Sequence, residues 1–96
     1  MLYNPMPLIP LTNSYAFNVE HITNRRMRLI VYKNGEEYVC RKENVKQLTE
    51  FLSEDEAKAF KGRLQLFKHH NDIAVTVKGE FIGSLTPTQL QSCIEN

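Results

Sequence analysis

Residues 27–40 read MRLIVYKNGEEYVC, and this stretch decides the fold of the chain. A run rich in Leu, Ile and Val leads into Asn34-Gly35, and a second β-prone run, Tyr38-Val39-Cys40, follows. Asn-Gly between two such runs is the strongest short-range signal for a hairpin, because both residues accept the positive φ angles of a type I′ turn. The stretch therefore predicts an antiparallel β-hairpin.

Two further segments of the chain show the period-2 alternation of strands. Residues 15–22, YAFNVEHI, place Phe17 and Val19 on one face and polar residues on the other, which predicts a half-buried strand before the hairpin. Residues 73–77 alternate in the same way, and Lys78-Gly79 turns the chain into residues 80–82. A largely antiparallel sheet of two hairpins and an N-terminal strand is expected.

The segment between the hairpins predicts two central helices. The first begins near Asn44 and has a one-sided apolar face, formed by Val45, Leu48, Phe51 and Leu52. Residues 53–56, SEDE, have the pattern of a capping box, which predicts a second helix from residue 54. Its apolar stripe would be formed by Ala57, Phe60, Leu64 and Phe67, and its C-terminal end by Lys68, His69 and His70.

A short C-terminal helix is predicted by residues 86–89, TPTQ, a second capping box with proline at the first helical position. Strands and helices thus fall into separate blocks, which is typical of an α+β fold with helices packed on one face of the sheet. We expect residues 1–14 to form a proline-rich apolar arm and residues 15–96 to form a single small α+β domain. No internal sequence repeat is apparent.

The composition narrows the class of protein. The chain has 96 residues and a net charge of +1, so no global field draws it to nucleic acid or to an anionic membrane. No apolar run approaches the roughly 18 residues that a membrane span needs. Two cysteines far apart in sequence favour reduced thiols over a disulfide framework. We therefore expect a soluble cytoplasmic protein without membrane contact.

The sequence offers the residue types of a catalytic or metal site but no arrangement that joins them. Cys40 and Cys93 lie outside any thiol-enzyme signature, and no glycine-rich phosphate loop is present. His69 and His70 would point about 100° apart on the predicted helix, so they are not expected to share one metal ion. We expect no enzyme activity, no cofactor and no bound metal.

The N-terminal arm is the leading candidate for a contact with another protein. Prolines at positions 5, 7 and 10 favour extended backbone, and the segment between them is too apolar for a free tail. The arm would either pack over its own domain or anchor in another protein or a second copy of this chain. The anchoring residues would be Tyr3, Met6, Leu8, Ile9 and Leu11.

An arginine cluster supports the alternative function of a nucleic-acid-binding protein. The residues that would contact phosphate or stack on a base are Arg25, Arg26, Arg28, Tyr32 and Lys33. Interleaved glutamates at positions 36, 37 and 43 oppose such binding, so a solvated mixed-charge surface competes with this interpretation.

The expected function is that of a non-enzymatic protein–protein interaction module. A small near-neutral α+β domain with an apolar arm and no cofactor motif is similar in kind to accessory proteins of phages and mobile elements. Such proteins act as inhibitors by occluding a surface on a larger host machine. This likeness concerns size and layout, and fold alone does not determine function.

Overall fold

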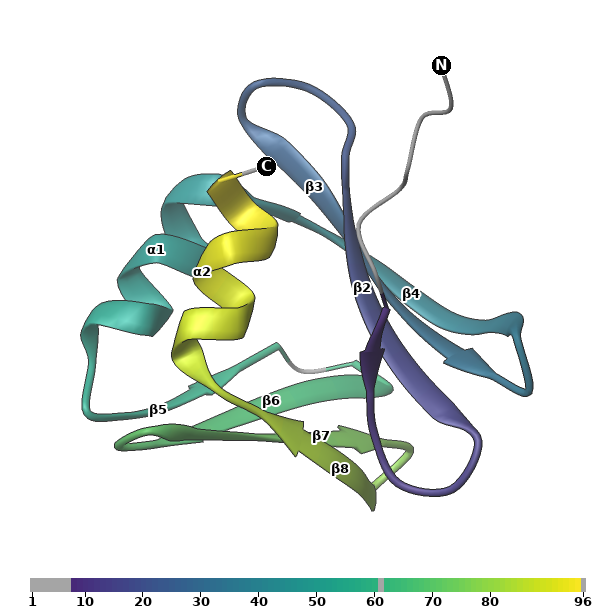
Figure 1. Ribbon diagram of the computed structural model, residues 1–96. Coiled ribbons are helices and arrows are strands. Elements are labelled where there is room, and N and C mark those ends of the chain that lie inside the picture. The colour runs from purple at the N-terminus through teal and green to yellow at the C-terminus, as the bar shows by residue number, and fades with distance from the viewer. Residues whose placement is uncertain (1–7, 61, 96) are drawn as a thin grey trace.

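The first half of the chain forms an antiparallel sheet whose strands follow one another in space as they do in sequence (Figure 1). The computed structural model describes residues 8–60 and 62–95. The sheet has the order β1-β2-β3-β4 and is followed by helix α1. The element bounds are β1 Ile9–Pro10, β2 Tyr15–His21, β3 Arg26–Lys33, β4 Glu36–Asn44 and α1 Val45–Ser53.

The second half repeats this plan. An antiparallel sheet of order β5-β6-β7-β8 is followed by helix α2. The bounds are β5 Glu56–Ala59, β6 Leu64–His69, β7 Asp72–Val77, β8 Glu80–Leu85 and α2 Pro87–Glu95. The described residues therefore form a small α+β structure with two antiparallel four-stranded sheets and two helices, where the sequence predicted one sheet and three helices.

The last hairpins of the two sheets, β3–β4 and β7–β8, match in detail. Asn34-Gly35 has φ angles of 54° and 81°, and Lys78-Gly79 has φ angles of 55° and 83°, so both are two-residue turns with left-handed backbone. In each hairpin, the register between the two strands shifts by one residue after the second pair from the turn. The shift is a β-bulge, in which Tyr38 of β4 and Ile82 of β8 are the residues without a partner on the opposite strand. The chain therefore contains a structural repeat of strands followed by a helix that the sequence did not reveal.

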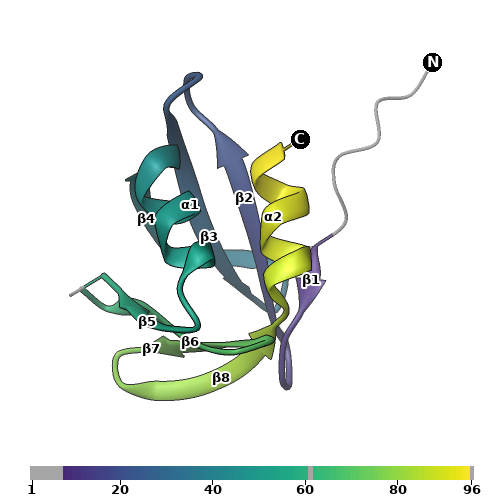
Figure 2. The ribbon, with the colours of Figure 1, turned by 90° about the vertical axis from the view of Figure 1, so that its left-hand side faces the viewer.

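The core lies between the two sheets and the two helices. Both helices occupy the angle that the sheets make with one another, and they contact each other there (Figures 1 and 2). The buried apolar residues form a cluster that draws on both sheets and both helices. Examples with no more than 1% of their surface exposed are Phe17, Leu29, Leu66, Val75, Leu48 and Leu90.

Both helices begin at the residues that the sequence indicates. The Asn44 side chain accepts a hydrogen bond from the Gln47 amide at the start of α1. At the start of α2, the Gln89 amide donates to Thr86 Oγ1 at 3.0 Å and the Thr86 amide donates to Gln89 Oε1 at 2.8 Å. The second capping box is therefore confirmed.

The prediction of a second central helix from residue 54 is wrong. The segment forms strands β5 and β6 instead, and Ser53 closes the end of α1 by donating from its hydroxyl to the Glu50 carbonyl. Of the four residues in the predicted stripe, Leu64 alone is fully buried. Strand pairing explains the difference, because β6 lies between β5 and β7 and buries alternate residues, Leu64 and Leu66, against the core.

Candidate protein-interaction groove

An open groove of about 720 Å³ lies between helix α1 and edge strand β5, and we call it the α1–β5 groove. Helix α1 and the residue after it line one side, β5 and Phe60 line the other, and two residues of β4 also contribute to the lining. The volume falls within the range of small ligand sites. The lining residues are Arg41, Glu43, Gln47, Leu48, Glu50, Phe51, Ser53, Glu54, Ala57, Lys58, Ala59 and Phe60.

The floor of the groove is apolar because each wall contributes its inward face. Leu48 and Phe51 are the buried residues of α1 and continue from the groove into the core. On β5, Ala57 and Ala59 alternate with exposed Glu56 and Lys58, so two small side chains face the groove side of the sheet. Their small size leaves the space open between the strand and the helix.

Strand β5 is held in place by two bonds to the connection that precedes it. Lys68 is buried at the end of β6, and its ammonium group donates to the Glu54 carbonyl. The His70 amide donates to the Asp55 carbonyl at 2.7 Å. These bonds fix the direction in which the chain leaves α1, and with it the width of the groove.

The outer edge of β5 presents backbone groups that are not used within its own sheet. β5 is the first strand of its sheet and pairs with β6 alone. Hydrogen-bonded residues alternate along an antiparallel strand, and the bond to the Asp55 carbonyl fixes the phase of this alternation. Ala57 and Ala59 therefore bond toward β6, whereas the N–H and C=O groups of Glu56 and Lys58 point outward.

The other three sheet edges are protected in ways that β5 is not. β1 is two residues long and ends in Pro10. The edge of β8 receives Thr12, whose amide and hydroxyl both donate to the Ile82 carbonyl, at 3.0 and 2.8 Å. β4 carries charged side chains at five of its nine positions. Short edges, bulges, charges and covering segments are the usual means of preventing strand addition. β5 is short and has two charged residues of its own, but unlike β4 it has no bulge, and unlike β8 its outer edge receives no backbone bond from another described segment, so we take it as the most accessible edge.

The rim of the groove is more acidic than basic. Arg41 stacks on the Phe60 ring at 4.6 Å from its centroid and pairs with Glu43 at 3.4 Å, so its charge is compensated. Glu50 and Glu54 form no ion pair within the part of the chain that the structure describes. A binding partner with a Lys or Arg side chain would find two unpaired carboxylates there.

The N-terminal arm packs on its own chain where the structure describes it. Ile9 pairs with Phe17 and is 8% exposed, and Leu11 packs against the core, whereas Leu8 is 42% exposed. Tyr3 and Met6 lie outside the described residues. Of the predicted anchoring residues that are described, only Leu8 is free to contact another protein without leaving the core.

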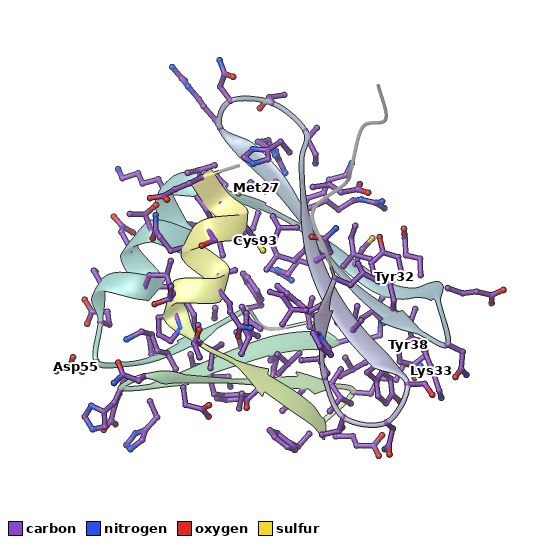
Figure 3. The ribbon with its side chains drawn as sticks, viewed as in Figure 1. Met27, Tyr32, Lys33, Tyr38, Asp55 and Cys93 are labelled. Atoms are coloured by element: carbon purple, nitrogen blue, oxygen red, sulfur yellow. The ribbon has the colours of Figure 1, made fainter. Side chains whose placement is uncertain are left out.

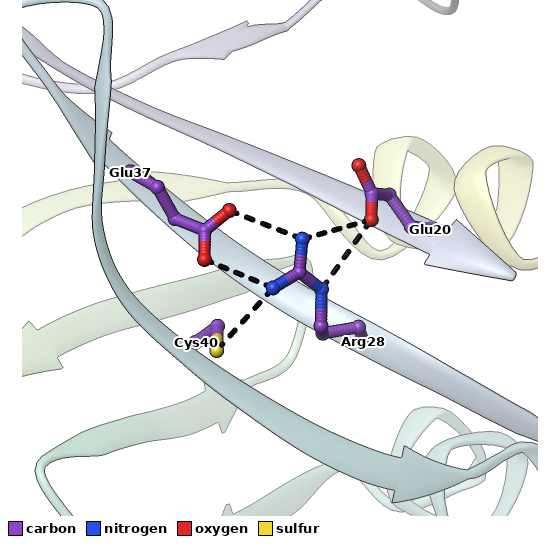
Figure 4. Close-up of polar contacts among 4 residues, drawn as sticks. All are labelled: Glu20, Arg28, Glu37 and Cys40. Atoms are coloured by element: carbon purple, nitrogen blue, oxygen red, sulfur yellow. Dashed lines mark hydrogen bonds and ion pairs between the residues drawn. The ribbon is translucent and has the colours of Figure 1, made fainter. Parts of the chain in front are cut away.

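The predicted arginine cluster is divided by the structure. Arg28 lies on the outer face of the first sheet, where its guanidinium bonds both Glu20 and Glu37 at 2.9–3.3 Å and also contacts Cys40 (Figure 4). The bonds to these carboxylates raise the pKa of Arg28. Two carboxylates around one arginine leave no net positive charge at this point to attract phosphate.

The other predicted nucleic-acid residues are spread over separate surfaces. Arg25 and Arg26 are exposed at the β2–β3 turn, where both backbone amides donate to Thr23 Oγ1. Tyr32 lies near Arg28 and its two carboxylate partners. Burial raises the pKa of Tyr32 most, and the negative charges of Glu20 and Glu37 raise it further. The structure therefore does not bring these residues together as one basic surface.

Lys33 belongs instead to an aromatic cluster that the sequence did not indicate. Its ammonium group lies 5.5 Å from the ring centroid of Tyr15 and 5.2 Å from that of Tyr38, and the Lys78 ammonium group lies 5.1 Å from the Tyr38 centroid. Neither lysine forms an ion pair with a described residue. We call Tyr15, Lys33, Tyr38 and Lys78 the Tyr–Lys cluster. In Figure 3, Lys33 and Tyr38 lie far from Asp55, the residue before β5.

The two cysteines lie in different environments. Cys40 is exposed and its sulfur accepts from Arg28 Nη1 at 3.7 Å. Cys93 is buried on α2 in the core, and burial raises the pKa of its thiol. One thiol thus contacts a cation on the surface, and the other packs as a small apolar side chain.

The groove residues on β5 were missed because the sequence assigned this segment to a helix. Two signals could have located them. The Ala57/Ala59 and Leu64/Leu66 pairs follow the period of a strand, and Gly62 between them is unfavourable inside a helix.

Comparisons with family models, with curated proteins and with solved structures find no match to this chain. Neither helix in the described part of the chain is long and apolar enough to cross a membrane.

Proposed function

We propose that the protein is a non-enzymatic interaction module that binds an extended segment of another protein along strand β5. The observation that carries this proposal is the open edge of β5 beside the α1–β5 groove. A strand added to such an edge gains backbone hydrogen bonds, and pockets beside the edge select its side chains. Both parts are present here, the outward groups of Glu56 and Lys58 and the apolar floor of the groove.

The groove defines the chemistry of the bound segment. The segment would be extended, with alternate apolar side chains directed toward Ala57, Ala59 and Phe51. A Lys or Arg residue in it would meet Glu50 and Glu54 at the end of α1. We place this binding in the cytoplasm, because two free cysteines far apart in sequence suit a reducing compartment.

The proposal is tested with linear peptides selected from a random library on the purified protein, and with two variants at one position. Lys58→Pro removes an outward N–H that the β5–β6 pairing does not use, so the fold should tolerate it. Lys58→Ala removes the same side chain and keeps the N–H. Selected peptides should bind the wild type and Lys58→Ala with similar affinity and Lys58→Pro at least about tenfold more weakly.

Two results would contradict the proposal. Peptides that bind Lys58→Pro as tightly as Lys58→Ala would show that the edge of β5 is not the binding element. A concentration-dependent dimer of the free protein that Lys58→Pro abolishes would show that the edge is occupied by a second copy of this chain.

The Tyr–Lys cluster supports single-stranded nucleic acid as a second candidate ligand. Two unpaired ammonium groups beside two tyrosine rings offer phosphate contacts and stacking surfaces. Binding should weaken steeply with salt, and Lys33→Ala with Lys78→Ala should reduce the affinity and the salt slope. The matched control is Arg25→Ala with Arg26→Ala. Equal effects of the two pairs, or no binding of a labelled oligonucleotide at low salt, would refute this candidate.

A further inference from the structure

Glu56, His69 and His70 form a cluster of metal-binding groups at the start of β5. Each offers one ligand atom, and these atoms all lie within 4.8 Å of one another. His69 Nδ1 is 3.3 Å from Glu56 Oε2, and the two imidazole rings are 4.3 Å apart between centroids. All three side chains are exposed, so an ion could reach them from solvent.

The fold creates this cluster from residues that the sequence separates. Glu56 and His69 are direct partners across β5 and β6, at the type of pair in which the backbones lie closest. His70 has a φ of +55° at the turn after β6, and its amide bond to the Asp55 carbonyl holds it beside β5. The sequence excluded a shared ion because it assigned both histidines to a helix, and the strand and turn remove that objection.

We propose that Glu56, His69 and His70 bind a divalent transition-metal ion of the Zn²⁺ class. Two imidazoles and one carboxylate are ligands that such ions prefer, whereas Mg²⁺ and Ca²⁺ prefer oxygen ligands. Ligand atoms around tetrahedral Zn²⁺ lie about 3.4 Å apart, since each is about 2.0–2.1 Å from the ion. Small rotations of three exposed side chains bring the cluster to this spacing.

The bound ion would keep at least one position open and would tie β5 to the β6–β7 turn. Three protein ligands leave a fourth tetrahedral position for water or for a side chain of a partner. Because Glu56 is the first residue of β5, the ion would also hold this edge strand in place. The proposal does not rest on peptide binding in the groove, and its test uses metal alone.

The test is a calorimetric titration of the full-length untagged protein with Zn²⁺, and with Mg²⁺ as the control ion. We expect saturable 1:1 binding of Zn²⁺ and none of Mg²⁺. His69→Ala, His70→Ala and Glu56→Gln should each weaken Zn²⁺ binding by about tenfold or more. His21→Ala and Cys40→Ser remove the remaining histidine and the exposed thiol, and both should leave the affinity within about twofold.

A second measurement, of the unfolding temperature, distinguishes a metal site that only the folded protein forms from the weak binding that any neighbouring pair of histidines provides. An ion that binds the folded state alone raises the unfolding temperature, whereas one that binds the unfolded chain equally does not. Zn²⁺ should therefore raise the unfolding temperature of the wild type, and Glu56→Gln should reduce the rise. An absence of saturable binding, affinity unchanged in both histidine variants, or an unfolding temperature that Zn²⁺ does not raise would overturn the proposal.

Discussion

Replacement of Gly83 by alanine should destabilise the protein by about 3–5 kcal/mol. Gly83 has a φ of +138°, a backbone conformation that costs an alanine about 1–3 kcal/mol. A Cβ at this position would lie 2.7 Å from the Leu11 Cβ, 2.9 Å from the Thr12 nitrogen and 3.1 Å from the Leu11 Cα. Leu11–Thr12 would have to move away from β8, which breaks both bonds from Thr12 to the Ile82 carbonyl, worth about 1 kcal/mol each.

The assay is urea unfolding followed by far-ultraviolet circular dichroism. Gly79→Ala is the matched control, because Gly79 also has a positive φ of +83° but no atom lies within 4 Å of the added Cβ. The control should show the conformational cost alone, so Gly83→Ala should lose about 2 kcal/mol more than Gly79→Ala. Equal losses in the two variants would refute the close packing of the arm on β8.

Three further changes test the arrangement around the groove and the core. Lys68→Met keeps the apolar stem of the side chain but leaves the Glu54 carbonyl without its donor. Urea unfolding should therefore show a loss of about 1–2 kcal/mol in the free energy of unfolding. Arg28→Met leaves two facing carboxylates on a partly exposed surface, and the loss of about 1 kcal/mol should shrink at high salt; a salt-independent loss would contradict the ionic explanation. Burial raises the pKa of Cys93, so a thiol reagent at neutral pH should modify Cys40 alone in the native protein; equal labelling of both thiols would contradict this burial.

The parts of the fold that the sequence predicts correctly depend on short-range chemistry. Asn34-Gly35 forms the expected turn, because its φ angles are set by the residues at the turn itself. Asn44 begins α1, and the reciprocal bonds of Thr86 and Gln89 begin α2. Each of these features is complete within about four residues, so no distant contact is needed to form it.

The prediction of a second central helix was wrong because long-range strand pairing outweighed the local sequence pattern. Leu64 and Phe67 fit a helical stripe, but Leu66 is fully buried and Phe67 is not, which is the alternation of a strand. The partner that decides between the two patterns is β7, which the sequence predicts to pair with residues 80–82 but not with β6. Local propensity is a weak guide where tertiary packing is available.

The candidate site could not be predicted for the same reason. The groove exists because β5 lies beside α1, and the sequence had assigned β5 to a helix. The surroundings of the arginine cluster could not be predicted for a different reason, since Glu20 and Glu37 are distant in sequence from one another but both bond to Arg28 across strands β2, β3 and β4. Charges that are counted along a chain do not show which of them neutralise each other in space.

Amide hydrogen exchange along β5 tests most directly whether its open edge binds an extended segment. In the free protein, the amides of Glu56 and Lys58 should exchange quickly and those of Ala57 and Ala59 slowly, because only the latter bond toward β6. Saturation with a selected peptide should protect Glu56 and Lys58 and change the two alanines little. Fast exchange at Glu56 and Lys58 in both states, with the peptide bound, would contradict strand addition at β5.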